Sequence, residues 1–309
     1  MLEKMRDNIY KLTIHFASGM QEVNCYFIKG KQGYTVIDTG IYSKEAFALW
    51  RRVLDAGIKV EKVVLTHTHQ DHIGLAKWFQ ENVGVPVYTS NLGYKEMQKN
   101  REFNVRSKIK SLVMKHGGYE LPANNKDDAF IYHFEPDGFF ENDQKIQLGD
   151  DLYEVIWTPG HAPDHFCFYN HSNKVMIIGD HLLKKISPVI GLWTGEEANP
   201  ISDYYHSLDL MMKYPTDIAL PGHGDSIDDL DKRVAETRSR HDARLKQVLE
   251  YAKNERKTAH QVCEEIYGNS ESALYVSQLM ATITRLLYLE SVGKISREEA
   301  EGVVMFRAN

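Results

Sequence analysis

Residues 66–72 of this 309-residue chain read Thr-His-Thr-His-Gln-Asp-His. Four of these seven side chains are of the types that bind zinc-like ions: His67, His69, Asp71 and His72. The run follows the apolar segment 60–65, which predicts a short buried strand, and it precedes 73–79, which predicts a helix start. Strand alternation places the first two histidines on one side of the chain, whereas the aspartate and the last histidine come from the next bend. We therefore expect this strand-to-helix turn to supply ligands to two neighbouring metal ions.

Three later segments repeat the arrangement of an apolar strand, a glycine and a metal-binding side chain. These side chains are His161 after the predicted strand 153–157, Asp180 at the end of 174–180, and His223 within 217–224. Proline and glycine force a turn directly after a strand. One such strand end arises easily by chance, but three beside the first cluster indicate a common site.

Other side chains near these segments have two interpretations each. Asp38 closes a predicted strand just before Gly40, where a carboxylate either hydrogen-bonds a ligand histidine or caps the strand end. His165 follows His161 closely, and we expect it to support a ligand or to face the substrate, with an ordinary loop role as the alternative. His181 and Lys184 follow Asp180, so they are candidates for the cleft and for contact with an anionic substrate.

Composition limits the class of protein. The formal net charge of −6 argues against strong non-specific binding to nucleic acid or anionic membranes. Three widely spaced cysteines, Cys25, Cys167 and Cys263, form neither a zinc motif nor a disulfide framework. The N-terminal residues are charged and lack a signal-peptide core, and no window reaches transmembrane length. We expect a soluble, cytoplasmic protein without a membrane partner.

The order of predicted elements indicates an α/β fold followed by a separate unit. Residues 9 to about 38 predict strands, residues 43–56 predict a helix, and further strands at 60–65 and 85–89 flank a helix start at 73–79; this order predicts a layered α/β domain. Residues 95–116 predict a basic helix inside an apparent insertion at about 92–134, either a lid over the site or a solvated helix face. From about residue 231 three helices precede a small ribbon, a winged-helix pattern that often binds DNA through its third helix. That helix offers only Arg285 as a basic residue, so we favour packing or formation of a homodimer.

The full set of candidate ligands resembles the metallo-β-lactamase superfamily in its two-metal, glyoxalase II-like form. The likeness covers about residues 9–230 and includes Asp38-Thr39-Gly40, Thr158-Pro159-Gly160-His161 and Pro221-Gly222-His223. It implies an αββα sandwich over residues 1–230. The unit 231–309 is similar to the winged-helix cap of lactamase-B-like hydrolases.

The resemblance also implies a role for each ligand. His67, His69 and His161 are expected to hold one ion, Asp71, His72 and His223 the second, and Asp180 both. We expect two divalent ions, with zinc as first choice and iron or manganese as alternatives for the same donor set. Dedicated β-lactamases of the best-known class carry a cysteine at the position of Asp180 and lack an aspartate at Asp71, so β-lactam cleavage is not the favoured task. The single-iron sulfur dioxygenase branch uses fewer ligands.

The favoured function is metal-dependent hydrolysis of a small ester or thioester, and an anionic substrate is one option. Asp71 is the catalytic candidate, because it can bind a metal and also accept a hydrogen bond from the attacking hydroxide. One alternative is a ribonuclease or phosphodiesterase that uses the same metals, although it needs a cationic track to the site. A second alternative is a regulatory protein that binds nucleic acid through the C-terminal unit. Nucleic acid is therefore the less favoured partner.

Overall fold

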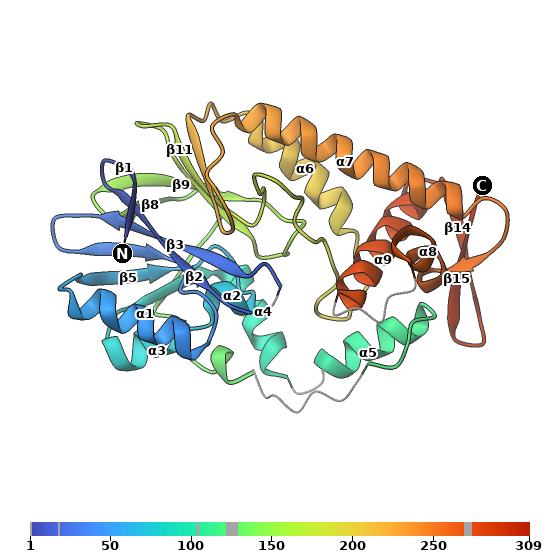
Figure 1. The fold of residues 1–309 in the computed structure, drawn as a ribbon, viewed down its shortest axis with the longest axis horizontal. Coiled ribbons are helices and arrows are strands. Elements are labelled where there is room, and N and C mark those ends of the chain that lie inside the picture. Colours follow the sequence, from blue (N-terminus) through green and yellow to red (C-terminus); the bar gives the residue numbers. More distant parts are fainter. Residues whose placement is uncertain (1, 18, 103–104, 122–128, 269–273) are drawn as a thin grey trace.

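Two β-sheets lie face to face between two layers of helices. The computed structural model describes residues 2–17, 19–102, 105–121, 129–268 and 274–309. In Figure 1, α1 and α3 cover the outer side of the N-terminal sheet, and α6 and α7 lie on the opposite side of the molecule. The αββα sandwich expected from the sequence is therefore confirmed.

The first sheet contains seven strands in chain order. They are β1 (Glu3–Arg6), β2 (Ile9–His15), β3 (Glu22–Lys29), β4 (Tyr34–Ile37), β5 (Val60–Val64), β6 (Val87–Ser90) and β7 (Gly138–Phe140). Strands β1 to β4 pair antiparallel, whereas β4 to β7 pair parallel. Parallel strands end at the same edge of a sheet, so the loops after β4, β5 and β6 emerge together.

The helices over this sheet form from amphipathic segments. They are α1 (Lys44–Asp55), α2 (Gln70–Ile73), α3 (Ala76–Trp78), η1 (Phe79–Val83), α4 (Asn91–Arg101) and η2 (Ala129–Tyr132). In α1, the Ser43 hydroxyl accepts a hydrogen bond from the amide of Ala46 and caps the helix. Ala46, Trp50 and Val53 lie on one face at helical spacing and are buried against the sheet. The predicted helix 43–56 is confirmed within one residue at each end.

The second sheet has the order β12-β11-β10-β9-β8. Its strands are β8 (Lys145–Leu148), β9 (Asp151–Trp157), β10 (Phe166–Asn170), β11 (Val175–Gly179) and β12 (Ile218–Pro221). Helices α6 (Pro200–Met211) and α7 (Leu230–Tyr251) pack on its outer face. The five residues of β10 and the five of β11 are all buried, as expected of strands covered on both faces.

A dry core joins the two sheets. It includes Tyr26 and Ile28 from the first sheet and Tyr153, Phe168 and Leu220 from the second. Fully buried aromatic and aliphatic side chains of this kind give the largest share of folding free energy through apolar burial. The relative position of the sheets is therefore set by this interior.

The basic segment 95–116 is divided in the structure. Helix α4 ends at Arg101, Glu102 adopts an extended conformation, and α5 begins at Val105 and ends at Lys115, so the prediction of one continuous helix is wrong. Arg101 explains part of the division, because its guanidinium donates hydrogen bonds to the carbonyl oxygens of Tyr132 and Phe134. The insertion predicted at about 92–134 also includes a polar loop expected at 121–128, of which residues 122–128 lie outside the described residues.

The C-terminal unit combines helices and a small sheet. It comprises the end of α7, then β13 (Lys257–Thr258), α8 (Ala259–Tyr267), α9 (Tyr275–Ser291), β14 (Ile295–Ala300) and β15 (Val303–Ala308), with strand order β13-β15-β14. Figure 1 shows α7 extending from the sandwich to this unit. Leu279 and Phe306 belong to the same buried cluster as Met176 and Leu208 of the sandwich. A boundary at residue 230 and the winged-helix assignment both stay predictions.

A search of the described helices for one with the length and apolarity needed to cross a bilayer finds none. The three cysteines are buried and unpaired, as the sequence predicted.

Candidate metal centre

The candidate ligands all lie just beyond the carboxyl ends of strands. The segment 66–72 follows β5, His161 follows β9, Asp180 follows β11 and His223 follows β12. Strands β11 and β12 are parallel neighbours, and the amide of Gly222 donates a 2.7 Å hydrogen bond to the Gly179 carbonyl. The amide of Phe166 in turn reaches the Thr66 carbonyl at 2.9 Å, so the edges of the two sheets meet where the ligands project.

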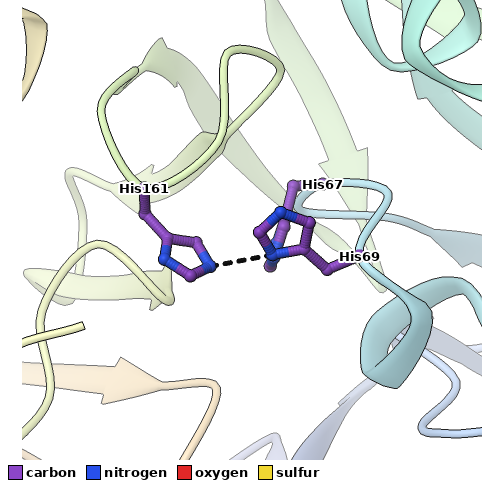
Figure 2. A group of neighbouring side chains, drawn as sticks. All are labelled: His67, His69 and His161. Atoms are coloured by element: carbon purple, nitrogen blue, oxygen red, sulfur yellow. Dashed lines mark hydrogen bonds between the residues drawn. The ribbon is translucent and has the colours of Figure 1, made fainter. Parts of the chain in front are cut away.

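Seven predicted ligands gather into overlapping groups. Potential ligand atoms lie within 4.8 Å of one another in three sets: His67, His69 and His161; His67, His72 and Asp180; Asp71, His72 and His223. The first and third sets are the two triads expected for separate ions, and the middle set joins them through Asp180. Figure 2 shows His161 facing His69 across a gap beside His67, with His161 Nε2 and His69 Nδ1 2.9 Å apart. Two nitrogens on one tetrahedral zinc lie about 3.3 Å apart, so this geometry suits a shared ion.

Asp180 lies between the two triads. Its carboxylate is 3.4 Å from His161 Nε2, 3.4 Å from His72 Nε2 and 3.1 Å from His223 Nε2. His223 Nε2 is also 3.4 Å from the Asp71 carboxylate. This is the position required of a carboxylate shared by two cations.

Unpaired polar atoms test whether the pocket fits cations. His67 Nε2, His72 Nε2, His223 Nε2 and Asp180 Oδ1 are buried without a hydrogen-bond partner. Each buried polar atom without a hydrogen-bond or metal partner lowers the free energy of unfolding by roughly 1–3 kcal/mol. Imidazole nitrogens and carboxylate oxygens are the donors that zinc, iron and manganese accept, so these residues fit divalent ions.

The opposite ring nitrogens are held by oxygen atoms. His72 Nδ1 lies 2.8 Å from Asp38 Oδ2, His161 Nδ1 lies 2.8 Å from the Val189 carbonyl, and His223 Nδ1 contacts the Glu22 carbonyl. An oxygen acceptor keeps the proton on Nδ1 and leaves the Nε2 lone pair for a metal. Asp38 therefore has the geometry expected of a residue that orients a ligand.

Charge within the cluster suits cation binding. Burial, reinforced by the positive charge of His161, lowers the pKa of His69 to about 3, and burial also lowers the pKa of His67. At His223 the Asp180 carboxylate outweighs burial and raises the pKa to about 10. Although burial opposes ionisation, His223 and His72 hold the pKa of Asp180 well below its usual range. The cluster thus offers an ionised carboxylate and neutral imidazoles at His67 and His69, whereas His223 has to release a proton when it binds a cation.

The remaining predicted residues occupy different places. His165 is buried and binds backbone and hydroxyl groups, because its Nε2 accepts from the Asp180 amide at 3.0 Å and its Nδ1 lies 2.8 Å from Thr158 Oγ1. His181 is fully buried with its ring 5.2 Å from that of Tyr204, and none of the three ligand groups includes it.

Lys184 lines a cavity beside the cluster, which we call the His223 pocket. This cavity of about 230 Å³ is bordered by Met20, Leu183, Lys184, Lys185, Ile186 and His223, among others. The ammonium groups pair loosely with acidic side chains, at 3.9 Å for Lys184 and Asp228 and 3.5 Å for Lys185 and Asp225. The pocket thus joins a candidate ligand and apolar side chains with two lysines and the acidic residues Glu22 and Asp225.

Sequence reasoning missed several supporting groups. The Thr66 hydroxyl donates a 2.7 Å hydrogen bond to Asp38, and the same oxygen lies 3.0 Å from His67 Nδ1. Thr68 donates two hydrogen bonds to Asp164, one from its amide and one from its hydroxyl. Asn24 donates to the carbonyl oxygens of Pro221 and Gly224, which fixes the loop that carries His223. One sequence feature could have indicated such supporting residues: a threonine begins both ligand segments, at position 66 and at position 158.

Comparisons with known proteins identify a family and several relatives. Residues 19–223 match the family model described as the Metallo-beta-lactamase superfamily. The probable metallo-hydrolase YqjP of Bacillus subtilis is 28% identical over 303 residues, which are 94% of this chain and 91% of the relative. The hydroxyacylglutathione hydrolase GloC of Haemophilus influenzae is 29% identical over 163 residues, which are 52% of this chain and 67% of that protein.

A solved structure shares the whole fold. The crystal structure of a beta-lactamase domain protein from Burkholderia ambifaria aligns with a TM-score of 0.88 and 23% sequence identity. It covers 100% of this chain and 93% of its own. The likeness therefore extends over the C-terminal unit as well as the sandwich.

Proposed function

Because the chain belongs to the metallo-beta-lactamase superfamily, we propose that it hydrolyses a small thioester or ester with two divalent ions. The observation that carries this proposal is the position of Asp180, whose carboxylate lies between two triads of ligand atoms. A single-ion site needs only one triad and would leave the three ligand atoms of the other triad without a bound cation. Zinc is the ion we favour, with iron or manganese as alternatives.

In this proposal His67, His69 and His161 hold one ion, Asp71, His72 and His223 hold the other, and Asp180 contacts both. Ions bound there would lower the pKa of a water molecule toward about 7 and polarise the carbonyl group under attack. The chain itself fixes the ligand nitrogens, since Asp38 and two backbone carbonyls hold the opposite face of three imidazoles. Such preorganisation avoids reorientation during the reaction.

Asp71 is the residue we assign to proton handling. Its side chain is 26% exposed, whereas those of Asp180 and His223 are 7% and 2% exposed. An incoming water molecule can therefore reach Asp71 more readily than the deeper carboxylate. An ionised carboxylate in that place accepts a hydrogen bond from the nucleophile and orients it toward the substrate.

The His223 pocket supports a thioester with an anionic end. Leu183 and Ile186 offer apolar contact to an acyl chain, and the ammonium groups of Lys184 and Lys185 suit a carboxylate. A relative 29% identical to this chain is a hydroxyacylglutathione hydrolase, and acylglutathione is an anionic thioester. We therefore place anionic thioesters ahead of neutral esters.

The charge distribution does not favour ribonuclease activity. The basic residues of α4 and α5 pair largely with glutamates, as in Lys99–Glu96, Arg101–Glu135, Lys108–Glu196, Lys110–Glu120 and Lys115–Glu197. Paired cations attract a phosphate backbone weakly, because counterion release requires unneutralised charge. Arg285, the one basic residue of α9, lines a cavity within the C-terminal region.

A substrate panel on metal-analysed protein tests the proposal. S-acyl glutathione, acyl-coenzyme A, a lactone and single-stranded RNA would be compared under one set of conditions. We expect thioester turnover that Asp71→Asn lowers by roughly 10²-fold or more, whereas the same change at Asp151, a part-buried acceptor for Asn8 at the start of β9, leaves most activity. Cleavage of RNA with no thioester turnover would overturn the proposal, as would full activity of the Asp71→Asn protein.

A further inference from the structure

A second cavity lies between α7, α9 and the residue Ser187. Its volume is about 400 Å³, and its lining includes Ser187, Arg240, His241, Arg244, Tyr267 and Arg285. We call it the arginine pocket. It shares no lining residue with the His223 pocket, and within the described chain no carboxylate lines it. Three guanidinium groups therefore surround one cavity of a size that suits a small ligand.

The guanidinium groups of the arginine pocket bind neutral acceptors only. Arg240 donates to the Lys185 carbonyl at 2.6 Å, Arg244 to the Gln247 side chain at 2.6 Å and Arg285 to the Ala281 carbonyl at 2.8 Å. Other arginines of the chain have carboxylate partners instead, as in Arg233–Glu236, Arg238–Asp209, Arg256–Glu298 and Arg297–Glu197. Positive charge in the pocket is thus left without a counterion from the described residues.

Three polar atoms of the lining residues are also unsatisfied. Ser187 Oγ, His241 Nε2 and Arg285 Nε are buried and have no hydrogen-bond partner. Leaving a buried polar atom unpaired destabilises the folded chain. Burial, together with the charge of Arg244, lowers the pKa of Arg285, as expected for a cation that lacks a counterion. A ligand with several acceptor oxygens and negative charge would relieve these costs.

We propose that the arginine pocket binds a phosphate group of a small molecule. A phosphate offers several acceptor oxygens and up to two negative charges, and planar guanidinium groups bind it through paired hydrogen bonds. One compact group of three arginines around a single cavity suits a small phosphorylated compound better than a polymer, which needs a track of cations.

One segment of chain connects the arginine pocket with the candidate metal centre. Residues 183–186 line the His223 pocket, and Ser187 directly after them lines the arginine pocket. Arg233 donates to the carbonyls of Leu183 and Ile186, and Arg240 donates to that of Lys185. A phosphate near Arg240 therefore lies against the wall of the other pocket. The phosphate belongs either to a distal part of the substrate or to a free effector.

Calorimetric titration of the metal-loaded protein with inorganic phosphate tests the site. Phosphate also binds metal ions, so the measured quantity is the difference between wild type and Arg244→Gln/Arg285→Gln. We expect the double variant to lose one phosphate equivalent or to bind it at least roughly tenfold more weakly. Arg51→Gln/Arg52→Gln removes two exposed arginines of α1 and should bind as wild type does. Equal stoichiometry and affinity in wild type and the first variant would overturn the proposal.

Thermal unfolding separates ligand binding from a structural role. Without phosphate, Arg285→Gln should unfold at the same temperature as wild type or higher, because an uncompensated charge has been removed. With phosphate, only wild type and the α1 variant should gain stability. If Arg285→Gln does not fold, the single change Arg244→Gln gives the same comparison. A variant that is destabilised equally with and without phosphate contradicts the assignment.

Two thioesters distinguish the sources of the phosphate. If it belongs to the substrate, the double variant raises KM for acetyl-coenzyme A but not for phosphate-free S-acetyl-N-acetylcysteamine. If it is a free effector, added phosphate alters turnover of both compounds by wild type only. Loss of affinity for an RNA oligonucleotide without loss of phosphate binding would instead assign the pocket to nucleic acid and refute the proposal. Because binding is measured without turnover, its failure is distinguishable from failure of the proposed hydrolase function.

Discussion

Replacing Asp38 by asparagine should weaken one metal position without unfolding the chain. Asp38 accepts hydrogen bonds from the Thr66 amide at 2.8 Å and the Thr66 hydroxyl at 2.7 Å, and its Oδ2 lies 2.8 Å from His72 Nδ1. Its φ of +59° is a conformation that asparagine also tolerates. The two side chains have nearly equal volume, so packing around position 38 is preserved.

The chemical effect follows from the number of acceptors. An amide has one oxygen, and we expect it to face the Thr66 amide, because a backbone N–H can only donate. The amide nitrogen then faces His72 Nδ1 and requires a lone pair there, so the imidazole proton moves to Nε2. A protonated Nε2 cannot bind a metal. Loss of such an orienting carboxylate costs about 10- to 100-fold in metal affinity, which equals about 1.4 to 2.7 kcal/mol.

Elemental analysis and competition with a chromophoric chelator would measure this effect. We expect Asp38→Asn to retain one ion tightly and to release the second at lower chelator concentration than wild type. Asp151→Asn is the matched control, because Asp151 is a part-buried acceptor for Asn8 at the start of β9, the end of that strand away from His161. Unchanged affinity for both ions in Asp38→Asn, with an intact circular dichroism spectrum, would refute the argument about the His72 tautomer.

Three further outcomes are expected. Gly222→Ala places a methyl group 2.8 Å from His72 Cε1, so elemental analysis should find at least one ion fewer per folded chain, and a full complement would contradict this. Lys184→Gln/Lys185→Gln should raise KM for acyl glutathione by up to about fivefold per charge at low salt and leave a neutral lactone unaffected; steady-state kinetics at two salt concentrations test this. Burial lowers the pKa of His116 to about 4 from its usual value of about 6.5, so the unfolded chain binds more protons between these pH values. Stability present above pH 6.5 should be lost toward pH 4, by up to roughly 3 kcal/mol, and urea unfolding should show a shallower pH dependence in His116→Asn; an unchanged slope would exclude this residue as the cause.

The sequence predicted the candidate centre well because each ligand follows a strand closely. A side chain just beyond a strand end has a direction fixed by the strand, so the spacing of His67, His161, Asp180 and His223 implied a meeting point. The groups that hold the histidines were not predictable in the same way. The carbonyls of Val189 and Glu22 are backbone atoms, which every residue possesses, so their role depends only on the fold.

Long-range contacts explain why the break in the segment 95–116 and the position of Arg285 in a cavity were not predicted. The segment 95–116 has helical composition throughout, yet the contact of Arg101 with residues 132–134 accompanies a break that local propensity cannot reveal. Arg285 was the basic residue that a nucleic-acid role for α9 required. Its place in a cavity depends on how α9 packs against α7, which a single-sequence pattern does not specify.

The candidate ligands come from both sheets, and this origin determines whether a mutation in the interior first impairs metal binding or folding. His67, His69, Asp71 and His72 move with the first sheet, whereas His161, Asp180 and His223 move with the second. A conservative change at Phe168 or Tyr26, in the core between the sheets, can shift one sheet against the other while each keeps its own hydrogen bonds. Such a displacement would separate the two halves of the coordination sphere. Interior variants far from any ligand should therefore be found in screens for weakened cation retention before they are found in screens for unfolding.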